Sequence, residues 1–504
     1  MSNAKIGKLA RTGAMWTTGT NIGFWVVFTI TSMVLARYLS PEEFGLMALA
    51  NLTLVFVHTL LEFGLSYAFI QEKEVDQTDA STFFYLQVGI NILIWLGISL
   101  SAPFVAAYYQ QPVLKTLLPI FGFGYVLDAL SQVPMTMMAR ELNYKRNSLV
   151  RFAAAVVGSA VCIVMAVLGF GIWSMVADYL VNVGTVLLIV MFWYDWRPSL
   201  IFRMNSARRL LNFGKWMLLK SLLRYVAKNL DYILVSRILG LGALGYYERA
   251  FNLMRTPQRL ISNAVGGVLF SSFSRIQEEH ERLRLAFRKV MLTIAVVSYP
   301  ILVGMMLLTE EFILVIYGDA WTATITPLRI MCLAGIFVSF DPLLSSVLTS
   351  AGFVKYSAYR QIFEVALLAV ACYIGSFWGI TGVAWATVVL SVAVVLIMMQ
   401  LLKKMSRIGW RDYLQPQTGA LIAGTVMSIV VLLARWLWQR FLPYEPFSGL
   451  FVLTGLGALT YTGTLLQLNF PELADIKTEI REGAAKVLGK LAGKGRRGKE
   501  GDPE

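Results

Sequence analysis

Long apolar segments separated by short polar ones run through the whole chain. Fourteen of them are long enough to cross the roughly 30 Å hydrocarbon core of a bilayer. They lie at about 14–36, 45–70, 83–107, 116–138, 149–168, 171–194, 213–239, 245–273, 286–308, 322–350, 356–377, 379–402, 418–440 and 448–468. The eighth and tenth are the most polar. The pattern predicts an all-α polytopic membrane protein with about fourteen transmembrane helices.

The distribution of positive charge supports this count and gives an orientation. With the N-terminus in the cytoplasm, the N-terminal segment, the even-numbered loops and the C-terminal tail hold 32 of the 44 Lys and Arg residues. The odd-numbered loops hold only Arg37, Lys115, Arg237 and Arg440. Cytoplasmic loops carry an excess of Lys and Arg, and one missed span would scramble the alternation. We therefore expect both termini in the cytoplasm, with the chain in the cytoplasmic membrane.

Composition excludes several other classes. The chain of 504 residues is 57% hydrophobic and only 15% charged, more apolar than a typical soluble domain. Its net charge of +14 is explained by the basic loops, so no nucleic-acid partner is expected. The three cysteines lie in apolar segments and there are two histidines, so neither a metal site nor a bound cofactor is expected. No loop exceeds about 20 residues, and the chain is not expected to be an enzyme.

An internal repeat predicts two similar halves. Arg37, Leu39, Gly45 and Ala50 return 200 residues later as Arg237, Leu239, Gly245 and Ala250, each time between two long apolar segments. Gly169 and Gly379 open the outer turn before the last span of each half. Because both halves begin inside, they are parallel repeats with a substrate site between them. The predicted parts are an N-terminal lobe (1–200), a C-terminal lobe (201–411), two extra spans (412–470) and a basic cytoplasmic tail (471–504).

Charged residues enter the seventh and eighth spans on one helical face each. Asp231 follows Lys220, Arg224 and Lys228 at spacings of four, four and three, which keeps all four on one arc of the helix. Arg255 and Arg259 belong to a similar stripe that also holds Glu248, Asn252 and Ser262, with a kink expected at Pro257. Because charge at a helix centre is costly, we expect these cations to line a watery cavity that binds an anion. Two alternatives stay open: a salt-bridge network that only holds the bundle together, and an interfacial position for the eighth segment.

Acidic residues within the spans are candidates for ion coupling. His58 and Glu62 lie one turn apart in the second span, where they form either a proton-responsive pair or a simple hydrogen-bonded pair. Asp231 is a further candidate. The others are Asp128, Asp178, Asp341 and Glu364. Asp341 precedes Pro342 and predicts a broken helix.

A cationic cavity at membrane depth suits a phosphate or diphosphate on a lipid carrier, because the lipid tail can stay in the bilayer. A soluble anion is the competing ligand. A resemblance to a known family supports the same class of ligand. The residues that carry it are Leu35-Ala-Arg-Tyr-Leu-Ser-Pro-Glu-Glu-Phe-Gly45, then Glu62-Phe-Gly-Leu-Ser-Tyr-Ala-Phe-Ile-Gln71, and later Met138-Ala-Arg-Glu-Leu-Asn-Tyr-Lys145. These strings resemble the polysaccharide transporter family of Wzx-type flippases, in the multidrug/oligosaccharidyl-lipid/polysaccharide (MOP) superfamily.

The resemblance implies a two-lobed transporter that alternates between inward- and outward-open states. Its implied substrate is an undecaprenyl-diphosphate-linked oligosaccharide, moved to the outer leaflet for lipopolysaccharide, capsule or exopolysaccharide synthesis, with proton or sodium coupling. Membrane lipids and the polysaccharide polymerase or export machinery are the expected partners. The alternatives are a lipid II flippase, a drug/ion antiporter of the same superfamily and a membrane glycan polymerase. The surplus of cations disfavours the antiporter, and the lack of a long outer loop disfavours the polymerase.

Overall fold

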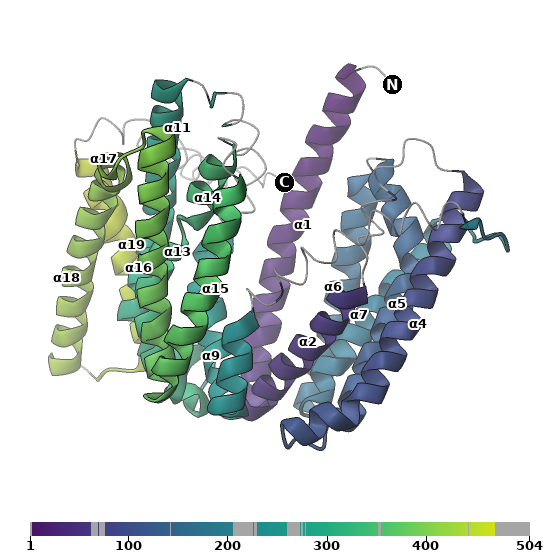
Figure 1. Ribbon diagram of the computed structural model, residues 1–504. Coiled ribbons are helices and arrows are strands. Elements are labelled where there is room, and N and C mark those ends of the chain that lie inside the picture. Colours follow the sequence, from purple (N-terminus) through teal and green to yellow (C-terminus); the bar gives the residue numbers. More distant parts are fainter. Residues whose placement is uncertain are drawn as a thin grey trace, which may run out of the picture. The chain divides into compact units, whose positions relative to one another are not determined.

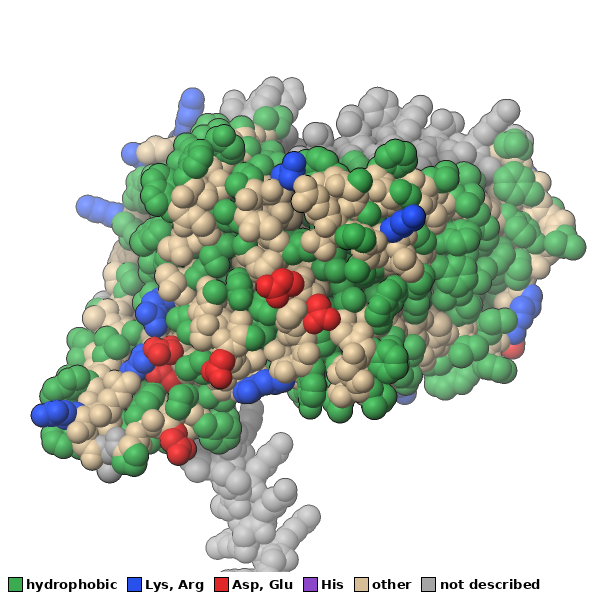
Figure 2. Space-filling model, turned by 90° about the horizontal axis from the view of Figure 1, so that it is seen from below, with side chains coloured by type: hydrophobic (Ala, Val, Ile, Leu, Met, Phe, Trp, Pro, Cys, Tyr) green, Lys and Arg blue, Asp and Glu red, His purple; other side chains and the backbone are tan. Residues whose placement is uncertain are grey.

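The computed structural model describes residues 3–61, 69, 76–141, 143–204, 225, 229–259, 273, 276–277, 279–350, 354–441 and 443–468. Every regular element among these residues is a helix (Figure 1). Nine helical stretches in this part of the chain are long and apolar enough to cross a membrane. This confirms the prediction of an all-α polytopic membrane protein. Figure 2 shows that apolar side chains dominate even the face seen from below, where charged side chains form only small groups.

The helices divide between two compact units. The first unit comprises Met1–Arg249, Ile316–Trp321 and Val365–Val383, and the second comprises Ala250–Val315, Thr322–Glu364 and Ala384–Glu504. The predicted lobes, 1–200 and 201–411, stay a prediction.

The first unit is built mainly from the N-terminal helices. These are α1 (Asn3–Tyr38), α2 (Pro41–Leu61), α4 (Gln77–Tyr108), α5 (Leu114–Arg140), α6 (Tyr144–Val167), α7 (Trp173–Trp193) and the part of α9 (Leu241–Met254) up to Arg249. Helix α5 packs against α4 and α7, and α6 packs against α7 and α1 (Figure 1). Helices α1, α4 and α5 extend beyond the predicted apolar segments at both ends, whereas α7 lies within its predicted segment.

The second unit holds the later helices. They are α11 (His280–Leu307), α12 (Thr309–Ile316), a 3₁₀ turn (Asp319–Thr324), α13 (Ile325–Val338), α14 (Asp341–Ser350), α15 (Val354–Ser376), α16 (Gly379–Ser406), the short α17 (Trp410–Leu414), a second 3₁₀ turn (Gln415–Gln417), α18 (Thr418–Phe441) and α19 (Pro446–Gln467). Helices α12, α15 and α16 and the first 3₁₀ turn also contribute residues to the first unit. Helix α11 packs against α13 and α18, and α18 packs against α19.

Two predicted helix breaks are present. The tenth span stops at Val338 and restarts at Asp341, with Pro342 in the first turn of α14, where a missing N–H costs nothing. Helix α9 ends at Met254, and a helical turn resumes only at 256, next to Pro257. Both breaks place charged residues at helix ends, where backbone groups are free to interact with them.

The internal repeat is visible as matching geometry within the first unit. A Cβ added to Gly45 would lie 1.9 Å from the carbonyl oxygen of Leu241, and one added to Gly245 would lie 2.0 Å from that of Pro41. The two contacts are equivalent under the repeat. Gly45 lies four residues after Pro41 and contacts Leu241, whereas Gly245 lies four residues after Leu241 and contacts Pro41. The first turns of α2 and α9 therefore cross backbone to backbone, which only glycine allows.

Reciprocal contacts surround this crossing. The Nε of Arg37 donates a hydrogen bond to the carbonyl oxygen of Ile316 at 3.3 Å, so the first copy of the repeat contacts the last residue of α12. The guanidinium of Arg237 lies over the ring of Tyr108, 4.9 Å from its centroid, so the second copy contacts the last residue of α4. We call the Gly45–Gly245 crossing and these two arginine contacts the outer clasp.

Trp321 packs against residues next to the outer clasp. Its indole Nε1 donates to the carbonyl oxygen of Ala36 at 2.9 Å, and the side chain is fully buried. The rings of Phe44 and Tyr246 meet it edge to face, with centroids 5.0 and 6.0 Å away. Segment 316–321 thus belongs to the first unit, although its neighbours on both sides in the sequence belong to the second.

At the other end of the first unit, the segment after α7 is tied to the start of α4. The backbone N–H of Ser199 donates to the hydroxyl of Ser81 at 2.9 Å, and Arg203 forms an ion pair with Asp76 at 3.3 Å. Asp76 also caps α4 by accepting from the N–H of Asp79. This backbone hydrogen bond, with help from Arg203, lowers the pKa of Asp76. Residues 199–203 are therefore anchored to the start of α4.

Candidate functional site

Part of the predicted cationic face cannot be placed. Lys220, Arg224, Lys228 and Glu62 lie outside the described residues, and His58 lies in α2 with a side chain that is likewise not described. The predicted face of the seventh span and the His58–Glu62 pair therefore stay predictions. Among the predicted site residues, Arg255, Arg259, Asp128, Asp231, Asp341 and Glu364 are described.

Arg255 and Arg259 follow the break after α9, in the second unit. The guanidinium of Arg255 lies 4.2 Å from the centroid of the Phe251 ring, and its Nε is buried without a hydrogen-bond partner in the described part of the chain. A guanidinium Nη of Arg259 donates to the side-chain oxygen of Asn252. The predicted stripe of Asn252, Arg255 and Arg259 is thus partly assembled, since Arg259 reaches back across the break to Asn252.

A second concentration of charge lies next to Arg255. Arg360 of α15 forms ion pairs with Glu364 on the same helix, at 2.8 Å, and with Asp341 at the start of α14, at 3.4 Å. The charge of Arg255 also acts on Glu364. Two guanidiniums and two carboxylates thus form one group, and we call Arg255, Arg360, Asp341 and Glu364 the four-charge cluster. Its formal net charge is zero.

The four-charge cluster faces away from the apolar side of α15. Ile362, Val370 and Tyr373 are each more than half exposed and form a stripe of the kind that contacts lipid. At about 100° per residue, the centre of this stripe lies roughly 150° around the helix from Arg360 and Glu364. The side chain of Arg360 is 10% exposed, whereas those of Asp341 and Glu364 are 37% and 35% exposed. The carboxylates therefore shield the guanidinium from the open side.

Asp231 lies in a different environment, within the first unit. Asp231 is 3% exposed and accepts a hydrogen bond from the hydroxyl of Tyr247 at 2.9 Å. The thiol of Cys372 interacts electrostatically with this carboxylate. Whether Asp231 also compensates Lys228, as the spacing predicts, lies outside the described residues.

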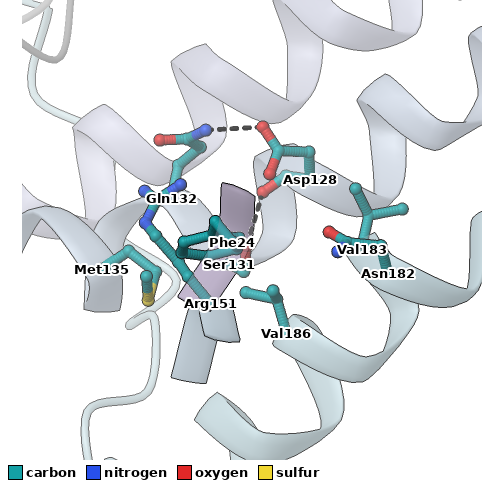
Figure 3. A pocket seen from close by; sticks show the side chains of 9 residues that line it. All are labelled: Phe24, Asp128, Ser131, Gln132, Met135, Arg151, Asn182, Val183 and Val186. Atoms are coloured by element: carbon teal, nitrogen blue, oxygen red, sulfur yellow. Dashed lines mark hydrogen bonds between the residues drawn. The ribbon is translucent and has the colours of Figure 1, made fainter. Parts of the chain in front are cut away.

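Asp128 lines a small polar cavity in the first unit (Figure 3). The cavity has a volume of about 130 Å³ and receives side chains from α1, α5, α6 and α7. A carboxylate oxygen of Asp128 accepts from the amide of Gln132 at 2.6 Å, while Arg151 and Asn182 line the opposite sides. The polar lining and the volume suit several water molecules or a small cation. Asp178, one turn before Asn182, lies outside this lining.

Two charged residues were missed by the sequence analysis. Arg360 was counted among the inner-loop cations, yet it lies inside α15 with two carboxylate partners. Arg249 is 8% exposed, donates to the hydroxyl of Ser32 at 2.5 Å and stacks on Phe44. For Arg360 the signal was Glu364 four residues later, an ion-pair spacing within a predicted span. For Arg249 it was the adjacent Glu248, which forms its ion pair at 3.2 Å.

Membrane-spanning helices, two helix breaks and charges inside the helices define the class as a multi-pass membrane transporter. The fold resembles that of the lipid II flippase MurJ in an inward closed conformation, with a TM-score of 0.71 and 16% identity, covering 89% of this chain and 98% of that one. It also resembles an inward-facing multidrug resistance MATE transporter of the MOP superfamily, with a TM-score of 0.59 and 17% identity, covering 76% and 94%. Both likenesses concern the fold alone.

A family model described as polysaccharide biosynthesis protein matches residues 34–326, and the chain belongs to this family. The resemblance seen in the opening motif is thereby confirmed. Lipopolysaccharide biosynthesis protein WzxC of Escherichia coli (strain K12) is 27% identical over 365 residues, covering 72% of this chain and 74% of the relative. Succinoglycan biosynthesis transport protein ExoT of Rhizobium meliloti (strain 1021) is 24% identical over 457 residues, covering 90% and 91%.

Proposed function

We propose that this protein moves an undecaprenyl-diphosphate-linked oligosaccharide from the cytoplasmic to the outer leaflet of the inner membrane. The product supplies the synthesis of a surface polysaccharide, namely lipopolysaccharide, capsule or exopolysaccharide. The names of the relatives support the pathway, because they concern lipopolysaccharide, succinoglycan and teichuronic acid biosynthesis. The excess of Lys and Arg in the even-numbered loops supports cytoplasmic termini.

The observation that carries the choice of substrate is the pair of arginines directly after α9. Arg255 has a buried Nε with no hydrogen-bond partner in the described chain, and Arg259 follows it by one turn. A guanidinium binds a phosphate through two parallel hydrogen bonds, so this pair suits a diphosphate. Lys220, Arg224 and Lys228, on the preceding span, are the further substrate-binding residues of the proposal.

Alternating access is the proposed mechanism. The cations hold the diphosphate head while the polyprenyl chain stays in the bilayer. The charged head therefore does not enter the hydrocarbon, and the apolar chain does not enter water. Coupling to protons or sodium ions is assigned to the membrane acids, with Asp231 and Asp128 as the candidates in the first unit. The polysaccharide polymerase or export machinery then receives the flipped substrate.

Proteoliposomes test the proposal. The purified protein is expected to expose a fluorescent undecaprenyl-diphosphate sugar to a membrane-impermeant reagent, and Lys220→Ala/Arg224→Ala/Arg255→Ala is expected to slow this strongly. Arg282→Ala, which removes an exposed ion pair with Glu279 at the start of α11, serves as the matched control for loss of positive charge. Unchanged transport by the triple variant would refute the site. Transport of lipid II alone would favour a lipid II flippase instead.

A deletion strain tests the pathway independently. Accumulation of a lipid-linked oligosaccharide on the cytoplasmic side is expected when the gene is removed, with restoration by the intact chain. Normal surface polysaccharide in that strain would contradict the proposal.

A further inference from the structure

We infer that the four-charge cluster is an exchange site: the diphosphate of the substrate displaces Asp341 and Glu364 from Arg360 and Arg255, and the displaced carboxylates take up protons from solvent. This inference rests on the proposed function, because it needs a diphosphate as substrate. It assigns a substrate-binding role to Arg360 and a coupling role to the two acids.

Geometry makes Arg360 available to an incoming anion. Its Nη1 atom makes both ion pairs, to Glu364 at 2.8 Å and to Asp341 at 3.4 Å, whereas its Nε is buried and has no hydrogen-bond partner in the described chain. A guanidinium binds phosphate through two parallel N–H groups. Because both carboxylates contact Arg360 through its single Nη1 atom, this two-point binding arrangement is not occupied. Arg255 next to it also has a buried Nε without a partner in this part of the chain.

Exposure sets the direction of the exchange. The two carboxylates are about one third exposed, while Arg360 lies beneath them at 10%. An anion that reaches the guanidinium must therefore first move a carboxylate. Glu364 can turn away on its long side chain, and Asp341 lies at the first turn of α14 beside the helix break, with only a long 3.5 Å contact from the Ser345 hydroxyl.

Charge balance then requires a cation. Without substrate the cluster is neutral, because two guanidiniums face two carboxylates. A diphosphate diester brings about two negative charges at neutral pH and takes both guanidiniums, which leaves the carboxylates uncompensated in a poorly solvated site. Unpaired charge in such surroundings is costly, and proton uptake removes it. The groups that face Glu364 are Arg360, Asp341 and Arg255, so no other described cation is placed to substitute for the proton.

A purely structural ion pair is the competing explanation. Arg360 and Glu364 are four residues apart on one helix, and Arg360 links α15 to α14. In that case the pairs would persist when substrate binds, and no proton would be taken up. The two explanations therefore differ in the proton stoichiometry of binding.

The test is binding of a sugar-linked undecaprenyl diphosphate, which is a diphosphate diester, to the full-length protein in nanodiscs, measured by calorimetry. Two buffers of equal pH but different ionisation enthalpy report the number of protons taken up. The expected result is net uptake, with an affinity that rises as the pH is lowered by up to about tenfold per pH unit for each proton taken up. Asp341→Asn/Glu364→Gln mimics the protonated cluster and is expected to bind tightly and independently of pH, whereas Arg360→Gln is expected to bind weakly.

Controls separate the possible failures. Glu279→Gln removes an exposed carboxylate paired with Arg282 and is expected to keep the wild-type proton uptake. Absence of binding by the wild type would overturn the proposed function itself. Binding without proton uptake, or binding by Asp341→Asn/Glu364→Gln with the wild-type affinity and pH dependence, would overturn the exchange site while leaving the flippase proposal standing.

Discussion

Substituting Gly45 by Ala tests whether the outer clasp holds the first unit together. The new Cβ would lie 1.9 Å from the carbonyl oxygen of Leu241 and 2.7 Å from its carbonyl carbon. Carbon atoms in contact normally keep about 3.5–4.0 Å between them, so the first turns of α2 and α9 must separate by more than an ångström. Both contacting groups are backbone, and no side chain can rotate away to relieve the clash.

The expected magnitude is a difference between two effects. Overpacking of a tightly packed site costs about 1–3 kcal/mol and sometimes more, while Ala in place of Gly in a helix gains up to about 1 kcal/mol. We expect a net loss of stability of about 1–2 kcal/mol for Gly45→Ala from these two principles. The equivalent change Gly245→Ala is expected to cost a similar amount, because its Cβ meets Pro41 at 2.0 Å.

The double variant gives the sharper result. One separation of the two turns relieves both clashes, so Gly45→Ala/Gly245→Ala is expected to lose less stability than the sum of the single variants. Two independent sites would add instead.

Thermal unfolding in detergent provides the assay. A thiol-reactive dye reports unfolding through the three cysteines, Cys162, Cys332 and Cys372, all of which are buried. Gly89→Ala in α4 is the matched control, since its Cβ would meet no atom within 4 Å. If Gly45→Ala and Gly245→Ala unfold at the same temperature as Gly89→Ala, the backbone crossing is not a determinant of stability and the reasoning is refuted.

Three further predictions follow from contacts outside the substrate site. Trp321→Ala is expected to destabilise the protein by about 3–5 kcal/mol, as for a large buried aromatic, and Trp321→Phe by less, with thermal unfolding as the measurement; equal effects would exclude a packing role. Glu311 is 1% exposed and pairs with Arg435 at 3.0 Å. Glu311→Gln breaks this buried pair and is expected to cost about 3–5 kcal/mol. Limited proteolysis before Pro446 measures the resulting loosening of α19, and an unchanged cleavage rate would contradict the prediction. Asp76 has a lowered pKa, so it stabilises the folded state above its unfolded pKa and this contribution disappears as the pH falls through its folded pKa. Asp76→Asn is therefore expected to be less stable than wild type at pH 7 and equally stable in acid, and a difference that persists in acid would contradict it.

Hydrophobic patterning was sufficient to predict the helices, because lipid requires long apolar segments whatever the tertiary structure is. Both helix breaks were predictable as well, since Pro257 and Pro342 act locally on the backbone. The 200-residue offset between Gly45 and Gly245 likewise indicated a matching pair of turns.

Contacts between distant segments were not predictable from the sequence. Trp321 pairs with Ala36 across 285 positions, and nothing in its local sequence distinguishes it from a tryptophan at the membrane interface. Arg360 was assigned to a loop because Lys and Arg near a span end normally lie outside the membrane. Only the fold shows that Asp341, nineteen residues before Arg360, pairs with the same guanidinium as Glu364.

The reciprocity of the outer clasp bears on how such a chain could arise. Arg37 contacts the end of α12, from the second half of the sequence, and Arg237 stacks on the end of α4, from the first half, so each copy of the repeat contacts the opposite half. In an ancestor made of two separate identical chains, the same contacts would have been intermolecular and related by a twofold axis through the Gly45–Gly245 crossing. Fusion of the two genes would have turned a dimer interface into an internal one, after which the halves were free to acquire different charges.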